Sequence, residues 1–116
     1  MATTFPMDRP RRVSSHALAS QIGKRDVSVI DVREPMEYAS GHIAGSLNIP
    51  LPHLEERMGE LPEGPLVVHC EGGYRSAIAA SVLSRAGKNG VMDMVGGFKA
   101  WVASKLPVEQ QATSPA

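Results

Sequence analysis

Hydrophobic residues along this chain follow two alternating spacings. Short apolar runs, most of them rich in β-branched residues, indicate buried strands at residues 27–32, 46–49, 66–70 and 91–95. Elsewhere, apolar residues recur every three or four positions, which predicts helices within residues 14–23, 35–38, 52–61, 76–86 and 98–104. Short strands that alternate with helices favour a parallel sheet with helices on both faces. We therefore expect an α/β fold built on a small doubly wound sheet.

Residues that suit helix termini stand at the ends of these segments. Ser14 or Ser15 supplies an N-cap for the first helix, and Gly23 suits its end. Pro35 fits the first turn of the second helix, and Pro52 opens the third. The third helix is expected to place three apolar side chains on one stripe: Leu54, Met58 and Leu61. The fourth helix is expected to turn four inward: Ile78, Val82, Leu83 and Ala86.

Both ends of the chain lack this apolar pattern. Residues 1–12 combine two prolines with three arginines, and residues 109–116 contain no large apolar side chain. We expect both segments to be flexible tails, because they cannot bury enough apolar surface to offset the entropy of ordering. The 116 residues fit one domain, which we expect to span residues 13–108.

Composition narrows the classes of function. Twelve basic and twelve acidic residues give a net charge of zero, which argues against nucleic-acid binding through bulk charge. No apolar run approaches the roughly 20 residues that span a bilayer, and the N-terminal segment lacks the apolar core of a signal peptide. Cys70 is the single cysteine, and the four histidines show no metal-ligand spacing. We therefore expect a cytoplasmic domain that uses no metal or other cofactor and binds neither nucleic acid nor membrane.

The strongest candidate chemistry lies in the turn after the strand at 66–70. Sites in doubly wound sheets lie at the carboxyl ends of strands, and here the turn reads Cys-Glu-Gly-Gly-Tyr-Arg-Ser. A thiol at a helix N-terminus, near an arginine, is favoured as the nucleophilic thiolate. Gly72 and Gly73 permit the positive φ that turns successive N–H groups toward one point. The sequence therefore predicts that Cys70 is a nucleophile in an anion cradle, with Arg75 offering donors at its rim.

Other polar residues near this sheet edge have structural interpretations. Neighbouring strand residues point to opposite faces, so His69 should point away from the cysteine thiol rather than form a Cys–His dyad as in thiol proteases. Asp31 and Arg33 share a strand face at the same edge, where we expect a structural ion pair or a helix-capping role. Glu71 either borders the mouth of the site or is a solvated carboxylate, and Tyr74 either walls the pocket or packs.

Three segments, in order, carry a resemblance to a known family. They are residues 30–34 with 38–50, Ile-Asp-Val-Arg-Glu and Tyr-Ala-Ser-Gly-His-Ile-Ala-Gly-Ser-Leu-Asn-Ile-Pro; the loop at 70–76; and residues 94–101, Met-Val-Gly-Gly-Phe-Lys-Ala-Trp. These resemble the N-terminal signature, the six-residue active loop and the C-terminal signature of the rhodanese (thiosulfate sulfurtransferase-like) family, over residues 13–106. The chain departs from the family pattern at Ala44, Ser46 and Ala100, where Pro, Ala and an acidic residue are usual.

The resemblance implies the rhodanese-like fold and a ping-pong sulfurtransferase. The Cys70 thiolate would take the outer sulfur of thiosulfate or a low-molecular-weight persulfide and hold it as a persulfide. A thiol acceptor, or cyanide, would then remove that sulfur. The substrate-binding residues implied are those of the loop: Glu71, Gly72, Gly73, Tyr74, Arg75 and Ser76. His42 matches the signature histidine of the family, and we expect it to be structural.

Three further readings stay open. The Gly-Gly-Tyr-Arg-Ser run also resembles rhodanese domains attached to persulfide dioxygenases, which implies a glutathione persulfide reaction. Phosphatase and arsenate reductase loops share the thiolate, nest and arginine, but they place five residues between Cys and Arg, where this chain has four. Alternatively, the domain is a sulfur carrier or interaction module that serves a partner enzyme without turnover of its own.

Overall fold

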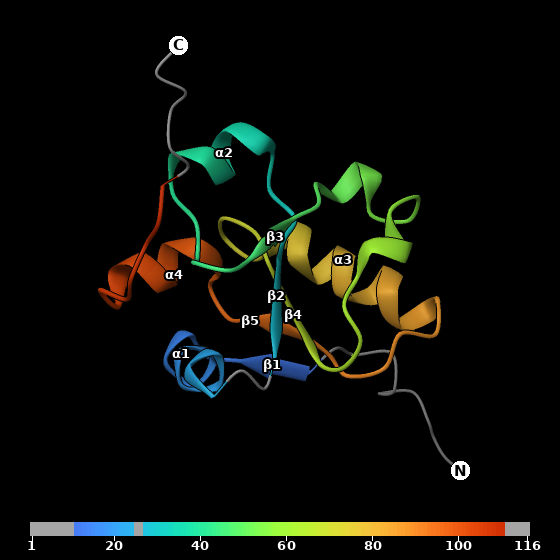
Figure 1. Ribbon diagram of the computed structural model, residues 1–116, viewed down its shortest axis with the longest axis horizontal. Coiled ribbons are helices and arrows are strands. Elements are labelled where there is room, and N and C mark those ends of the chain that lie inside the picture. The colour runs from blue at the N-terminus through green and yellow to red at the C-terminus, as the bar shows by residue number, and fades with distance from the viewer. Residues whose placement is uncertain (1–10, 25–26, 111–116) are drawn as a thin grey trace.

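A five-stranded parallel sheet forms the centre of the computed structural model, which describes residues 11–24 and 27–110 (Figure 1). The sheet order is β1-β5-β4-β2-β3. Its strands are β1 (Arg11–Val13), β2 (Ser28–Asp31), β3 (Leu47–Asn48), β4 (Leu66–His69) and β5 (Val91–Met94). The described α-helices are α1 (Ser15–Gly23), α2 (Pro35–Ser40), α3 (Tyr74–Arg85) and α4 (Gly97–Ala103). Every pair of neighbouring strands is parallel, which confirms the predicted α/β class.

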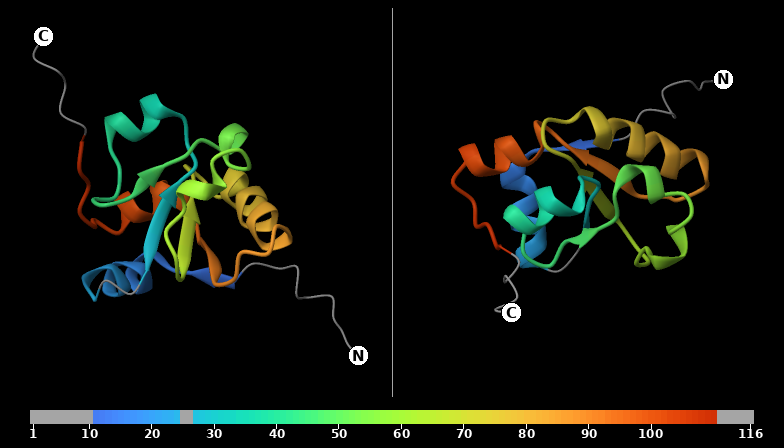
Figure 2. Two further views of the ribbon diagram at one scale, coloured as in Figure 1. Left: turned by 45° about the vertical axis from the view of Figure 1, so that its right-hand side comes forward. Right: turned by 90° about the horizontal axis from the view of Figure 1, so that it is seen from above.

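Helices cover both faces of the sheet (Figure 2). The sheet therefore separates two hydrophobic clusters, one on each face. Helix α3 packs on one face, where Leu66 and Val68 of β4 point, together with Cys70 just beyond the strand. Helices α1 and α4 contact each other on the opposite face, where Val67 points and where Trp101 is buried. This alternation along β4 places the candidate nucleophile on the α3 side of the sheet.

The segment predicted as a third helix folds differently. It forms two short 3₁₀ turns, η2 (Leu51–His53) and η3 (Met58–Glu60), so the helix expected from residue 52 is wrong. Gly59 has poor helix propensity, and Pro62 limits any continuation of a helix. The apolar stripe still reaches the core: Leu54 is buried, and Met58 and Leu61 pack against the α3-side cluster.

The predicted inward face of α3 is confirmed only in part, because Leu83 is buried and Val82 half-buried. Ile78 and Ala86 are exposed, contrary to expectation. The buried residues are Ser76, Ala79, Ala80 and Leu83, which follow the spacing i, i+3, i+4 and i+7 from Ser76. At the first turn of this face, the hydroxyl of Ser76 is hydrogen-bonded inside the protein to the Asp93 carboxylate.

The described domain reaches beyond the expected boundaries at 13 and 108. Arg11 and Arg12 pair with β5, so these two residues belong to the sheet rather than to a tail. His42 and Glu109 form an isolated antiparallel bridge through two N–H···O=C hydrogen bonds of 2.8 Å. The rest of the two expected tails, residues 1–10 and 111–116, lies outside the described residues.

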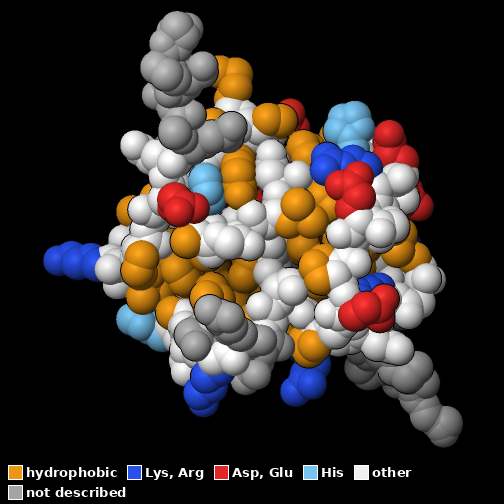
Figure 3. All heavy atoms as spheres, in the orientation of Figure 1, with side chains coloured by type: hydrophobic (Ala, Val, Ile, Leu, Met, Phe, Trp, Pro, Cys, Tyr) orange, Lys and Arg blue, Asp and Glu red, His pale blue; other side chains and the backbone are white. Residues whose placement is uncertain are grey.

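The surface agrees with the balanced composition. On the face shown in Figure 3, acidic and basic side chains are scattered rather than gathered by sign. Within the described part of the chain, no helix has the length and apolar character needed to cross a membrane.

Candidate active site

Cys70 lies in a turn that aims backbone N–H groups at its sulfur. Its side chain is 1% exposed, and Sγ accepts hydrogen bonds from the N–H groups of Gly73 (3.1 Å) and Ser76 (3.3 Å). Gly73 is the N-cap of α3 and has φ +114°, a conformation that glycine adopts with little strain. The hydroxyl oxygen of Ser76 lies 3.6 Å from Sγ. The turn therefore forms a nest that favours negative charge on this sulfur.

The remaining loop residues surround this nest without donating to it through their backbones. Among the described hydrogen bonds, no backbone N–H of Glu71, Gly72, Tyr74 or Arg75 reaches Sγ. The Tyr74 side chain is 80% exposed, so it lies at the rim rather than packing in the core. The Glu71 side chain is 38% exposed and faces Arg33 rather than solvent alone.

Arg75 is held in place by a carboxylate that the sequence analysis did not single out. Its two terminal nitrogens donate to Glu37 of α2 at 2.8 and 3.0 Å, a bidentate pair about one-third exposed. Hydrogen bonding to Glu37 chiefly, with a smaller effect from the Cys70 sulfur, raises the pKa of the Arg75 guanidinium. The pair joins α2 to the first turn of α3 across the rim of the site.

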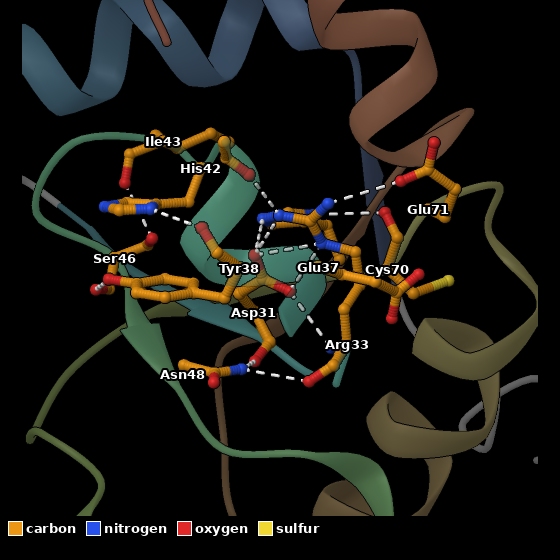
Figure 4. A network of polar contacts seen from close by, with 12 residues as sticks. Asp31, Arg33, Glu37, Tyr38, His42, Ile43, Ser46, Asn48, Cys70 and Glu71 are labelled. Atoms are coloured by element: carbon orange, nitrogen blue, oxygen red, sulfur yellow. Dashed lines mark hydrogen bonds and ion pairs between the residues drawn. The ribbon is translucent and has the colours of Figure 1, made fainter. Parts of the chain in front are cut away.

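The predicted ion pair between Asp31 and Arg33 is confirmed and forms the centre of a wider network (Figure 4). Arg33 donates from Nε and Nη2 to the Asp31 carboxylate at 2.7–3.1 Å, and its Nη2 also donates to the Gly41 carbonyl at 2.7 Å. Its Nη1 reaches Glu71 Oε1 at 3.3 Å. The guanidinium carbon lies 4.2 Å from the centroid of the Phe98 ring, a cation–π contact. Arg33 thus ties the ends of β2 and α2 to the loop that follows Cys70.

Both histidines near the site have structural positions. His69 is fully buried, its ring lies beside Phe98 on the sheet face opposite the thiol, and its Nδ1 is 3.1 Å from the Cys70 carbonyl oxygen. Burial chiefly lowers the pKa of His69, which keeps the ring neutral. His42 stacks on Tyr38 with ring centroids 3.8 Å apart, and its Nδ1 lies 2.7 Å from the Tyr38 carbonyl.

The start of α4 is hydrogen-bonded to the backbone of the loop that follows β4. The N–H of Phe98 donates to the Cys70 carbonyl at 2.8 Å, and the N–H of Lys99 donates to the Glu71 carbonyl at 3.0 Å. Gly97 makes this approach possible: it has φ +65°, and a Cβ there would lie 2.5 Å from the Glu71 carbonyl oxygen. Glycine is therefore required at position 97, because two backbones are in close contact there.

The sequence profile of the rhodanese-like domain family matches residues 14–104. The chain belongs to this family. A relative from Bacillus subtilis (strain 168), named uncharacterized protein YqhL, is 41% identical over 80 residues, 68% of this chain and 64% of the relative. A protein named sulfurtransferase from Allochromatium vinosum is 33% identical over 98 residues, 83% of this chain and 92% of its own. The solved structure of a rhodanese-related protein from Thermoplasma volcanium aligns with a TM-score of 0.81 at 35% identity, over 87% of this chain and 99% of its own.

A hollow of about 610 Å³ lies beside the loop that follows β4 in this rhodanese-like domain. Charged and apolar groups from the β2–α2 segment, the loop and α4 line it: Arg33, Met36, Glu37, Ser40, Gly41, Glu71 and Phe98. Met36 at its edge is 83% exposed. Across residues 11–24 and 27–110, no group of three His, Cys, Asp or Glu side chains is arranged to hold a metal ion.

Proposed function

We propose that this rhodanese-like domain is a sulfurtransferase that moves a sulfane sulfur through a Cys70 persulfide. The observation that carries the proposal is the environment of Cys70, a buried residue whose Sγ accepts hydrogen bonds from the N–H groups of Gly73 and Ser76. Fixed N–H dipoles stabilise negative charge without reorganising during the reaction. The same nest serves the free thiolate before the reaction and the charged outer sulfur after it.

The first half-reaction loads the cysteine. The Cys70 thiolate attacks the outer sulfur of thiosulfate, the new S–S bond forms, and the old one breaks to release sulfite with the bonding electron pair. A low-molecular-weight persulfide reacts in the same way and releases its thiolate. Charge is conserved in both cases: the negative charge of Cys70 is carried afterwards by the outer sulfur of its persulfide.

The second half-reaction unloads it. An acceptor thiolate, or cyanide, attacks the outer sulfur, and the Cys70 thiolate leaves as the S–S bond breaks. The donor and the acceptor use the same sulfur in turn, so the mechanism is ping-pong. Because the free thiol must persist between turnovers, we place the reaction in a reducing compartment such as the cytoplasm.

Arg75 and Glu71 line the approach to the sulfur in this proposal. Arg75 is about one-third exposed and paired with Glu37, so a donor with an anionic leaving group meets a guanidinium already held in position. The Glu71 carboxylate, drawn toward Arg33, is kept to the side of the mouth. This arrangement supports small anionic donors such as thiosulfate and glutathione persulfide.

Steady-state kinetics test the proposal. With thiosulfate and cyanide varied together, thiocyanate formation should give parallel double-reciprocal lines, and the near-isosteric variant Cys70→Ser should be inactive. Comparison of kcat/KM for thiosulfate and glutathione persulfide identifies the preferred donor. Loading of the wild type without turnover would favour the sulfur-carrier alternative. Hydrolysis of an aryl phosphate that is lost in Cys70→Ser would overturn the sulfurtransferase in favour of a phosphatase.

A further inference from the structure

A buried carboxylate lies directly behind the residue that contacts the cysteine sulfur. Asp93 on β5 has a side chain that is 5% exposed, and its Oδ1 accepts a hydrogen bond from the Ser76 hydroxyl at 2.7 Å. Arg12 lies at 4.0 Å from the other carboxylate oxygen, but the Arg12 side chain is 58% exposed. Burying an ionised carboxylate without a close buried cation costs free energy. The presence of Asp93 at this position therefore suggests that it takes part in the chemistry of the site.

Ser76 connects this carboxylate to the nucleophile. Its side chain is fully buried, and its Oγ lies between Cys70 Sγ at 3.6 Å and Asp93 Oδ1 at 2.7 Å. The hydroxyl has one proton to donate, and the carbonyl of Gly73 at 3.3 Å is a longer alternative to the carboxylate. With Asp93 ionised, the hydroxyl proton points to the carboxylate and Oγ is free to accept from the thiol. With Asp93 protonated, the carboxylic acid donates to Oγ and the hydroxyl points to the sulfur.

We propose that Asp93 accepts the proton of the Cys70 thiol through the Ser76 hydroxyl. As the S–H bond breaks, its proton passes to Ser76 Oγ, and the original hydroxyl proton passes to Asp93 Oδ1. The products are a Cys70 thiolate, an intact hydroxyl and a carboxylic acid, so one negative charge moves from Asp93 to the sulfur. Reversal of the relay returns the proton to the thiolate. The relay rests on the proposed sulfur transfer for its purpose, since that reaction needs the thiolate.

The surroundings of Asp93 suit a proton acceptor. Burial chiefly raises the pKa of Asp93, although the hydrogen bond from Ser76 and the charge of Arg12 act in the opposite direction. The groups that act on the carboxylate from the elements around it are Arg12 on β1, His69 on β4 and Ser76 on α3. Burial lowers the pKa of His69, so its ring adds little positive charge beside the Asp93 carboxylate. Arg75, also on α3, interacts favourably with charge on the sulfur.

The proton relay has a distinct pH signature. When two groups share one proton, they titrate as a pair in two macroscopic steps. In the relay, loss of the first proton from the Cys70–Asp93 pair already yields a fraction of thiolate, and loss of the second proton completes it. The rate of Cys70 alkylation by iodoacetamide, a neutral reagent, should therefore rise with pH in two steps separated by a plateau.

Two variants separate the relay from electrostatic repulsion. Asp93→Asn keeps the shape but cannot take a proton, and Ser76→Ala removes the bridge while leaving the carboxylate. Asp93→Asn removes one titrating group and the negative charge that opposes the thiolate, so it should give a single step and a rate at the wild-type plateau pH that equals or exceeds the wild-type rate. Ser76→Ala removes the hydroxyl that links the carboxylic acid to the thiolate, so it should lower the plateau rate by about tenfold or more, the effect of one pKa unit. Glu60→Gln, an acid-to-amide change on the exposed η3 turn, should leave the two-step profile unchanged.

Each outcome decides. A plateau rate in Ser76→Ala equal to that of the wild type would mean that Asp93 acts by charge alone, and two steps retained in Asp93→Asn would mean that another group shares the proton; either overturns the relay. Should Asp93→Asn fail to fold, infrared difference spectra of the wild type at the plateau pH decide instead. A carboxylic-acid C=O band, absent from Cys70→Ser, supports the relay, and its absence contradicts it. Alkylation uses no sulfur donor, so a failed relay is distinguishable from a failed sulfurtransferase.

Discussion

Asp31→Asn should be among the most destabilising single substitutions near the site. The Asp31 side chain is 0% exposed and that of Arg33 3%, and the carboxylate accepts from the backbone N–H, Nε and Nη2 of Arg33 at 2.7–3.1 Å. The variant leaves a buried guanidinium without its close counter-ion, which typically costs about 3–5 kcal/mol. Glu71→Gln removes the other carboxylate partner of Arg33. The Glu71 side chain is 38% exposed and its Oε1 lies 3.3 Å from Arg33 Nη1, so this change should cost only about 0–1 kcal/mol of stability.

Urea unfolding measures this difference. Trp101 is the single tryptophan and is 3% exposed, so its fluorescence reports the loss of the α1–α4 side of the core. The double variant Asp31→Leu/Arg33→Met should regain much of the lost stability, because it removes both buried charges together. Equal losses in Asp31→Asn and Glu71→Gln, or a loss below about 1 kcal/mol in Asp31→Asn, would refute the reasoning.

Three further predictions concern stability and the loop. Ser14→Ala removes the N-cap oxygen that accepts from the Ala17 N–H at 3.1 Å, and should cost about 1 kcal/mol in urea unfolding without changing sulfur loading. Hydrogen bonding by Arg75 lowers the pKa of Glu37 from 4.5, so the stabilisation from this pair is full above pH 4.5 and is lost as pH falls through the lowered folded value; Glu37→Gln should flatten that part of the stability profile. Gly97→Ala should destabilise more and slow sulfur loading more than Gly45→Ala, since both glycines have positive φ but a Cβ at Gly45 meets nothing within 4 Å.

The local features of the site could be predicted from the sequence, but most of the residues that reach it from distant segments could not. The strand before Cys70, the glycine turn and the helix after it follow one another in the chain, so their pattern predicted the cradle. The Asp31–Arg33 pair was also accessible, because alternate residues of a strand share a face. Glu37 and Asp93 gave no comparable signal, since parallel crossovers bring them to the loop from distant segments.

Two errors have similar physical causes. The apolar stripe at residues 52–61 predicts a helix, but a glycine and flanking prolines allow the same side chains to reach the core from 3₁₀ turns. The apolar residues of α3 predict an inward face that includes Ile78 and Ala86, whereas the buried face includes the polar Ser76. A buried serine is predictable only when its hydrogen-bond partner, here Asp93, is known.

The covalent intermediate is the central claim, and intact mass spectrometry tests it most directly. Reduced protein treated with thiosulfate or glutathione persulfide should gain one sulfur, about 32 Da, and lose it again on addition of a thiol acceptor. The folded Cys70→Ser variant should gain nothing under the same conditions. A wild type that keeps its mass with either donor, while its thiol is free and its fold intact, would contradict the account.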